Sequence, residues 1–512
     1  MTSPPSSGTP RPDDLLERFV HGFSWSLAAA VAGRTLGLAS SLLLPRILGP
    51  EGQGTLGVLT SFLGLVTIVG VFGTNTALLK LVPEMGVRHP ERVPGLVSTT
   101  FIAALVMAGL VSTCLVLASP VLASGVYARP DIQGYLGLMG LAVVPNVLAI
   151  LASGAMQGYQ AFRSLALAST AVSLIGVPIQ LGMAWAFGLS GAVAAVGAMS
   201  VVGGLVLFGA VLREARRTGR PLRARFERQG FVQAVRFAFP IFLSAVPVVA
   251  APWIVNTALV RASCGPTGAG WFSVAWSFWD LVLFLPTQAT APSVTVYSEL
   301  VARGDHRVLE ATCKKNVKVL WLVTLMVALP LATSAPLVMG GVFGEPYAEG
   351  WPAMFFLCAG TLGVAANIVY GFLLLSYGKV WHAVLLNGSW FLLLVLGLLV
   401  LVPSYGATGA AIAYAIAYGG FTVLLAVYSR RALDIRIRGL AGGTAFTAAA
   451  FGIGWALASS LGMLSALAAL PLTGLVFAIV WKRGLEDEER TFVRTRFATL
   501  VRRRRDAGPE GS

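Results

Sequence analysis

Apolar stretches of about 20 residues follow one another along most of the chain, and short polar segments separate them. A helix of that length rises about 1.5 Å per residue and crosses the roughly 30 Å hydrocarbon core of a bilayer. The pattern predicts fourteen transmembrane helices, at residues 21–44, 55–79, 96–119, 134–156, 164–187, 189–212, 237–260, 268–292, 319–342, 351–375, 380–402, 406–428, 441–461 and 463–481. We therefore expect an all-α polytopic membrane protein.

The basic residues indicate how these helices are oriented. The chain has 37 Lys and Arg residues. With the N-terminus placed in the cytoplasm, 33 of them fall in cytoplasmic segments, one (Arg34) lies within a span, and the outer connections hold Arg46, Arg129 and Arg261. Lys and Arg concentrate on the cytoplasmic side of membrane proteins. The asymmetry predicts a multi-pass protein of the plasma (inner) membrane with both termini in the cytoplasm.

Composition narrows the class further. Hydrophobic residues make up 56% of the chain and charged residues 12%, against about 25% charged in soluble domains. The formal net charge of +15 does not indicate a nucleic-acid partner, because the basic residues gather on one side of the predicted membrane. The four Cys and four His are scattered, so we expect no metal site and no bound cofactor. Residues 1–20 predict a disordered cytoplasmic tail rather than a cleavable signal peptide.

Two glycine-rich turns indicate an internal repeat. Residues 49–54 read Gly-Pro-Glu-Gly-Gln-Gly and residues 265–270 read Gly-Pro-Thr-Gly-Ala-Gly, at an offset of 216. A Gly-x-x-Gly-Ala pattern recurs at 188–192 and 406–410. An even number of spans per copy makes the two copies parallel, related by an axis along the membrane normal. We expect the turns to be tight helix connections rather than phosphate loops.

The repeat divides the chain into lobes. We assign residues 21–236 to an N-lobe of six helices with a basic cytoplasmic linker, and residues 237–439 to a C-lobe of six helices. Two further helices occupy 440–482, and a charged cytoplasmic tail occupies 483–512.

These features resemble the MOP exporter superfamily, in particular its Wzx-type flippases of polysaccharides and lipid-linked oligosaccharides. The resemblance rests on Arg34, on the turn at 45–54 and its copy after the seventh span, and on the Gly-x-x-Gly-Ala starts of spans six and twelve. It covers nearly the whole chain. It implies a V-shaped, MATE-like pair of lobes around a central cavity, lined largely by helices one, two, seven and eight. A lipid-pyrophosphate-linked sugar would turn over through that cavity.

Two charges lie near the middle of predicted spans, where an unneutralised charge is costly. The Arg34 guanidinium offers a fork of donors suited to phosphate oxygens; the alternative is a structural ion pair with Asp280. Asp280 either binds a coupling ion, H⁺ or Na⁺, or neutralises Arg34 when no substrate is bound. The sequence leaves these alternatives open.

Other candidates lie at the ends of the spans or are uncharged. Arg46 and Arg261, at the outer ends of spans one and seven, either bind phosphate at the outer mouth or snorkel to the interface. Lys80 either attracts anionic head groups or anchors the second span. Three amide side chains either contact sugar hydroxyls or bridge helices: Asn75, Asn256 and Gln288. Four tryptophans either stack on sugars or form packing and belt contacts: Trp253, Trp271, Trp276 and Trp279.

The sequence thus predicts a transporter rather than an enzyme. It would flip an undecaprenyl-pyrophosphate-type lipid-linked oligosaccharide across the plasma membrane by alternating access, for polysaccharide or cell-envelope biosynthesis. The expected partners are membrane lipid, the glycan lipid, and glycosyltransferases or a glycan polymerase, and not nucleic acid. The alternative is a MATE-type cation or drug exporter coupled to H⁺ or Na⁺, in which Asp280 would be central. A membrane glycosyltransferase or ligase is less favoured, because the outer loops are short.

Overall fold

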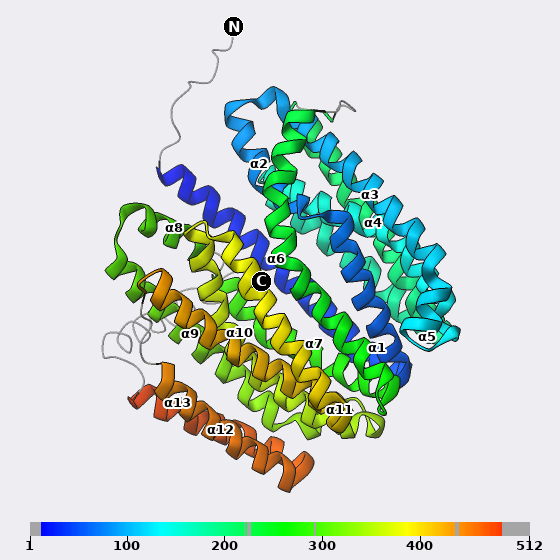
Figure 1. Ribbon diagram of the computed structural model, residues 1–512, viewed down its shortest axis with the longest axis vertical. Helices are drawn as coiled ribbons and strands as arrows, with labels where there is room; N and C mark the ends of the chain where they lie inside the picture. Colours follow the sequence, from blue (N-terminus) through cyan, green and yellow to red (C-terminus); the bar gives the residue numbers. More distant parts are fainter. Residues whose placement is uncertain (1–11, 220, 223–226, 291–292, 436–439, 484–512) are drawn as a thin grey trace, which may run out of the picture.

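The computed structural model describes residues 12–219, 221–222, 227–290, 293–435 and 440–483 (Figure 1). The side chains of some helical residues, among them 12–36 and Gln288, lie outside the description. The described chain contains no strand. Its α-helices are α1 (Pro12–Val71), α2 (Thr74–Arg88), α3 (Val93–Val121), α4 (Gln133–Gly158), α5 (Phe162–Arg217), α6 (Arg228–Arg261), α7 (Gly265–Thr290), α8 (Ser293–Arg303), α9 (His306–Thr333), α10 (Trp351–Ser376), α11 (Val380–Ala432), α12 (Leu440–Leu461) and α13 (Ser465–Arg483). Short 3₁₀ or π segments are η1 (Pro90–Arg92), η2 (Leu122–Val126), η3 (Pro130–Ile132), η4 (Leu337–Val342), η5 (Glu345–Gly350) and η6 (Gly462–Leu464).

The two predicted tails fall largely outside these residues, because 1–11 and 484–512 are not described. The helix α1 begins at Pro12, earlier than the residue 21 expected from the apolar pattern. A proline at the first helical position and acidic residues in the first turn favour a helix start, and here Asp13 and Asp14 follow Pro12.

Within the described residues, ten segments are long and apolar enough to cross a membrane. Four of these segments contain a glycine with a positive φ at which the helix is interrupted. Counting each of the four as two helices gives fourteen, the number predicted. The four positions are Gly49 (φ 67°), Gly188 (φ 60°), Gly406 (φ 52°) and Gly462 (φ 55°).

At these glycines the chain turns back on itself. Figure 1 shows α1 reversing at the lower right, so that its second half returns toward α2. In α5, Gly176 lies against Met199 and Gly203 against Val172, which places the two halves side by side around Gly188. We call the end of the molecule that carries these glycines the kink end, and the opposite end, which carries most of the Lys and Arg residues, the basic end.

The backbone repeats as the sequence predicts. Residues with a positive φ recur at offsets of 215 to 218, although this conformation is uncommon outside glycine. The pairs are Gly49 and Gly265, Ala128 and Gly344, Gln160 and Gly378, Gly188 and Gly406, and Gly219 and Asp434. The π segments η2 and η4 also occupy equivalent places. Two parallel six-helix repeats followed by two helices are therefore confirmed.

One predicted span is not continuous. The stretch 55–79 breaks at Phe72 and Gly73, both with a positive φ, and α2 begins at Thr74. A Cβ atom at Gly73 would lie 2.8 Å from the carbonyl oxygen of Ala238. The close approach of α6 therefore requires glycine there, and the hydropathy pattern carries no sign of it.

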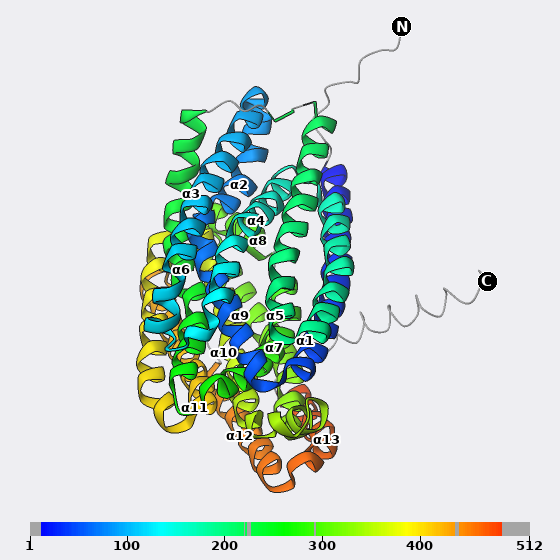
Figure 2. The same ribbon diagram turned by 90° about the vertical axis from the view of Figure 1, so that its right-hand side faces the viewer.

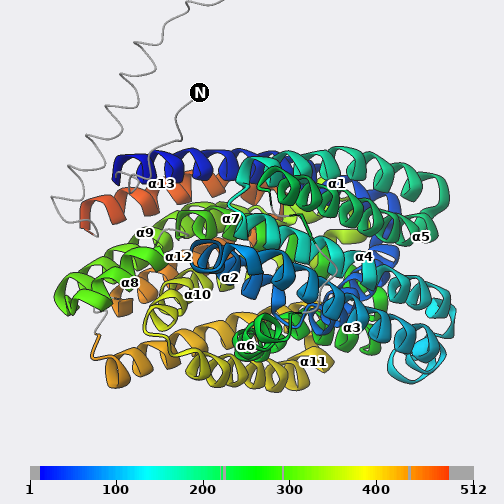
Figure 3. The ribbon, with the colours of Figure 1, turned by 90° about the horizontal axis from the view of Figure 1, so that it is seen from above.

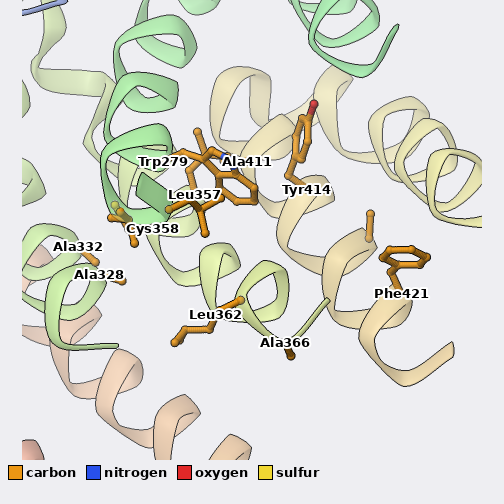
Figure 4. Packing of buried hydrophobic residues seen from close by; sticks show 14 of the residues in the cluster. Trp279, Ala328, Ala332, Leu357, Cys358, Leu362, Ala366, Ala411, Tyr414 and Phe421 are labelled. Atoms are coloured by element: carbon orange, nitrogen blue, oxygen red, sulfur yellow. The ribbon is translucent and has the colours of Figure 1, made fainter. Parts of the chain in front are cut away.

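Buried side chains form two hydrophobic cores, one built from residues between 44 and 238 and one from residues between 251 and 480. Helix α6 contributes Ala238 to the first and Val255 to the second, so it crosses from one core to the other. In the second core, Trp279 of α7 packs among α10 and α11 (Figure 4). Large apolar side chains such as Leu117 and Leu385, each 74% exposed, cover the outside, as a lipid-facing surface requires.

The peripheral helices complete the arrangement. The first half of α1 runs beside α5 (Figures 2 and 3), and Ser40 donates a hydrogen bond to Gln180 at 2.9 Å. Helices α12 and α13 lie side by side at the lower edge of Figures 1 and 2 and pack against α9.

Candidate functional site

The two glycine-rich turns, far apart in the sequence, pack against each other at the kink end. A Cβ atom at Gly54 would lie 1.9 Å from the carbonyl oxygen of Pro266, and one at Gly270 would lie 1.9 Å from that of Pro50. Because Gly54 and Gly270, and Pro50 and Pro266, are equivalent in the repeat, the contact is reciprocal. We call this contact between residues 49–54 and 265–270 the glycine crossing.

The repeat symmetry continues about one helical turn further along α1 and α7. Gly57 and Ser273 are also equivalent at the offset of 216, and a Cβ atom at Gly57 would lie 2.3 Å from the Ser273 hydroxyl oxygen. The pseudo-twofold axis therefore passes between α1 and α7 at this level. A larger side chain at Gly57 would hold the two helices apart.

Directly beside this contact lies a cavity of about 310 Å³, formed by α1, α6 and α7. We call it the interlobe cavity. Its lining residues are Gln53, Gly57, Thr60, Ser61, Pro252, Asn256, Phe272, Ser273 and Trp276.

Asn256 links the helices that form the cavity. Its side-chain nitrogen donates to the carbonyl oxygen of Gly57 at 3.4 Å and to the hydroxyl of Ser61 at 3.3 Å. Its side-chain oxygen is buried without a hydrogen-bond partner among the described residues, as is the side-chain oxygen of Gln53. Both oxygens are enclosed by protein atoms and have almost no accessible surface.

Trp276 and Phe272 form the aromatic part of the cavity wall, with ring centroids 5.9 Å apart. The Trp276 ring has two further aromatic neighbours. It stacks on Trp279 with centroids 5.4 Å apart and planes inclined by 17°. Tyr414 meets it edge-on at 5.2 Å. The Trp276 ring is therefore held in place by its packing against the second hydrophobic core.

Two contacts clamp the lobes together at the kink end. The buried Tyr347 hydroxyl in η5 donates to the carbonyl oxygen of Pro45 at 2.9 Å. The Arg46 side chain donates to the carbonyl oxygen of Val342 in η4. Both contacts join α1 to segments of the second repeat, so they add to the closure made by the glycine crossing.

A polar cluster around Arg129 holds the first glycine-rich turn in place. Arg129 belongs to the same repeat as that turn. Arg129 donates to the Asp131 carboxylate at 2.6 Å and to the Thr55 hydroxyl at 3.3 Å, and its guanidinium lies 3.7 Å from Glu51. The hydrogen bond from Arg129 lowers the pKa of Asp131 below its ordinary value. This cluster fixes residues 51–55 against η3.

The structure places two of the predicted candidates, Asn256 and Trp276, in the interlobe cavity. Arg46 and Arg261 are exposed at the kink end. Lys80 is exposed on α2, with its ammonium 4.3 Å from the centre of the Phe237 ring.

Among the described side chains, two further predicted residues do not line that cavity. Asp280 is exposed on α7, and Asn75 is half-buried in the first turn of α2. The side chains of Arg34 and Gln288 lie outside the described residues.

Sequence reasoning missed four cavity residues: Gln53, Thr60, Ser61 and Ser273. They carry no charge, and their helices read as ordinary apolar spans. The available signal was the repeat itself, because Gly57 and Ser273 are equivalent positions and small residues on a symmetry axis allow two helices to approach.

The fold and the site define a multi-pass membrane protein with the architecture of a two-lobed transporter. A family model described as "Polysaccharide biosynthesis protein" matches residues 43–352, more than half of the chain. The chain belongs to this family of polysaccharide biosynthesis proteins. None of the curated proteins gives a significant match.

Solved structures share the fold at low sequence identity. A lipid II flippase, MurJ, in an inward closed conformation gives a TM-score of 0.70 at 12% identity, over 89% of this chain and 98% of that chain. A multidrug resistance transporter of the MATE family, inward-facing, gives 0.63 at 15% identity, over 80% and 97%. A MOP superfamily transporter from Pyrococcus furiosus gives 0.60 at 14% identity, over 80% and 94%. The predicted resemblance is thus confirmed at the level of the fold, which the chain shares with these transporters.

Proposed function

We propose that this protein flips a lipid-linked oligosaccharide across the plasma membrane by alternating access, with the kink end outside and both termini in the cytoplasm. The observation that carries the proposal is the polar interlobe cavity, which lies between two repeat-related lobes beside the glycine crossing. Transporters built from parallel repeats hold substrate at the repeat interface and open it to one side at a time. Membership of a polysaccharide biosynthesis family supports a glycan as the cargo.

The lipid carrier in this proposal is undecaprenyl pyrophosphate or a lipid of the same chemistry. Arg34 lies within α1, about 13 residues into the predicted span, and a guanidinium there would bind pyrophosphate oxygens. Lys80 at the basic end would attract the anionic head group, and Arg46 and Arg261 at the kink end would receive it. Glycosyltransferases would supply the cargo and a glycan polymerase would consume it.

The test is flipping of a fluorescent undecaprenyl-pyrophosphate-linked oligosaccharide in proteoliposomes. We expect Arg34→Ala to slow flipping by roughly 10- to 150-fold, because a charge-assisted hydrogen bond contributes about 1.5–3 kcal/mol. Arg34→Lys should be intermediate, since it keeps the charge but loses the planar fork. Arg236→Ala removes an exposed arginine at the basic end of α6 and serves as the control. Wild-type rates in well-folded Arg34→Ala protein would refute the role of Arg34, and no flipping by wild type would refute the function.

A cation exporter is the second candidate, and the exposed carboxylate of Asp280 on α7 favours it. A cationic substrate or a coupling ion needs such a carboxylate. In the same liposomes, uptake of a lipophilic cation that is insensitive to Arg34→Ala and lost in Asp280→Asn would support this candidate. Glycan flipping that requires a proton or sodium gradient and is lost in Asp280→Asn would instead assign Asp280 to ion coupling.

A further inference from the structure

The two C-terminal helices, α12 and α13, contact the part of the second repeat that clamps the kink end. They follow the second repeat and have no counterpart in the first. The chain between α9 and α10, residues 334–350, contains η4 and η5, and both clamp contacts with α1 come from it, at Val342 and Tyr347. We call residues 334–350 the clamp segment. The residue before it, the residue after it and one residue within it all contact the C-terminal helices or the turn η6 between them.

The contact before the clamp segment is made by Thr333, the last residue of α9. Ser465, the first residue of α13, is fully buried and donates a hydrogen bond from its hydroxyl to the carbonyl oxygen of Thr333 at 2.7 Å. A Cβ atom at Gly454 in α12 would lie 2.8 Å from the Thr333 hydroxyl oxygen, so α12 packs closely here too. Both C-terminal helices therefore hold the start of the clamp segment.

The contact after the clamp segment is aromatic. The ring of Trp351, the first residue of α10, lies 4.8 Å from the ring of Trp455 in α12, with the planes inclined by 35°. The Trp455 ring also lies 5.0 Å from those of Phe355 and Phe356 in α10. Such ring pairs stabilise a contact beyond the area that they bury. Helix α12 therefore fixes the end of the clamp segment as well as its start.

Within the clamp segment, the π segment η4 is packed between η5 and η6. A Cβ atom at Gly340 would lie 2.8 Å from the methyl carbon of Met463 in η6 and 3.4 Å from the Cβ atom of Ala348 in η5. Gly125 is the counterpart of Gly340 in η2 at an offset of 215, and a Cβ atom there would meet nothing within 4 Å. The packing by Met463 is therefore particular to the second repeat.

We propose that α12 and α13 control the opening of the kink end by holding the clamp segment against α1, with Met463 and Ser465 as positioning residues. The inference rests on the proposed alternating access and does not depend on the cargo. If the clamp segment were free to move, its contacts with α1 would first have to offset the entropy of ordering it. Fixing the segment on α12 and α13 removes that cost, so a looser attachment shifts the protein toward the state in which the kink end is open.

The test measures how fast a membrane-impermeant maleimide, added at the kink end, labels a cysteine placed in the interlobe cavity by Thr60→Cys. The full-length protein is used, with its four native cysteines replaced. We expect Met463→Ala to raise the rate about fivefold through loss of apolar contact, and Ser465→Ala to raise it about fivefold through loss of a buried hydrogen bond. Both changes should act through the clamp segment. Adding Tyr347→Phe to Met463→Ala should therefore raise the rate by much less than the product of the two single effects.

The control is Leu464→Ala, which truncates the neighbouring side chain of η6, one that is 64% exposed. Its labelling rate should equal that of the parent protein. Parent rates in both Met463→Ala and Ser465→Ala, with faster labelling in Tyr347→Phe, would refute the role of α12 and α13 and leave alternating access standing. A lower melting temperature without faster labelling would refute it too, because the two helices would then only stabilise the second core.

Two further outcomes would also overturn the inference. Effects of Met463→Ala and Tyr347→Phe that multiply would show that Met463 does not act through the clamp segment. Equally fast labelling of the parent protein from both sides of the membrane would refute alternating access, and the role of the C-terminal helices with it.

Discussion

We predict that a single methyl group added at the glycine crossing will open the kink end. Gly270→Ala places a Cβ atom 1.9 Å from the Pro50 carbonyl oxygen, whereas ordinary contact begins at 3.4 Å, so the two turns must separate by about 1.5 Å. The neighbouring atoms are backbone, at 2.7 and 2.9 Å, and cannot rotate away. Overpacking of this kind costs about 1–3 kcal/mol. If the cost falls on the closed state alone, the open state gains about 5- to 150-fold in population.

The assay is labelling of a cysteine introduced by Thr60→Cys in the interlobe cavity, after replacement of the four native cysteines. A membrane-impermeant maleimide is applied to each side of the membrane in turn. We expect Gly270→Ala and its repeat equivalent Gly54→Ala to accelerate labelling from the kink end. Gly64→Ala, in the same helix as Gly54 with nothing within 4 Å of the added atom, is the control.

The direction of the stability change distinguishes the two crossing glycines from the control, Gly64. Within a helix, replacing glycine by alanine ordinarily stabilises by roughly 0.5–1 kcal/mol. Gly64→Ala should stabilise the protein in this way, while Gly54→Ala and Gly270→Ala should not. Wild-type labelling rates in folded Gly270→Ala protein would refute the view that the crossing closes the kink end.

Two further predictions concern the supports of this closure. Tyr347→Phe deletes the hydroxyl that donates to Pro45; since one hydrogen bond contributes about 1 kcal/mol, cavity labelling should rise about fivefold, and an unchanged rate would contradict a clamping role. The lowered pKa of Asp131 means that its bond from Arg129 stabilises the fold above the unfolded value of 3.8, and that this contribution is lost as the pH falls through the lower folded value. Thermal unfolding of Asp131→Asn should therefore show a smaller loss of stability than wild type between neutral pH and pH well below 3.8, and equal losses would exclude the ion pair.

The fold follows from the sequence to a large extent because its main determinants are local. Span length fixes the number of crossings, and glycines such as Gly188 and Gly406 mark where the chain reverses, since L side chains rarely adopt a positive φ. The break at Gly73 has a different origin. It depends on the approach of α6, which is a tertiary contact, and no local pattern of residues 55–79 encodes it.

The site is less accessible to sequence reasoning, because charge was the main signal available. Charged residues within spans stand out in an apolar chain, and they direct attention to Arg34 and Asp280. The interlobe cavity is instead lined mainly by amides, hydroxyls and two aromatic side chains, which are common in transmembrane helices as bridging and packing groups. Asn256 was predicted since it is an amide in span seven, whereas Gln53 was absorbed into a turn. Its place in the cavity depends on the contact between the two turns, which is a tertiary contact.

That position of Gln53 links binding to the opening of the kink end. Gln53 belongs to the first glycine turn and also lines the interlobe cavity, next to the contact of Gly57 with Ser273. Asn256 and Trp276 come from α6 and α7, so the two amides and the aromatic ring lie on helices from both repeats. Any movement that separates the turns must therefore move Gln53 away from Asn256 and Trp276. A substrate that contacts residues of both repeats in this cavity would lose contacts as the kink end opens, so its release would be coupled to opening by the geometry of the repeat.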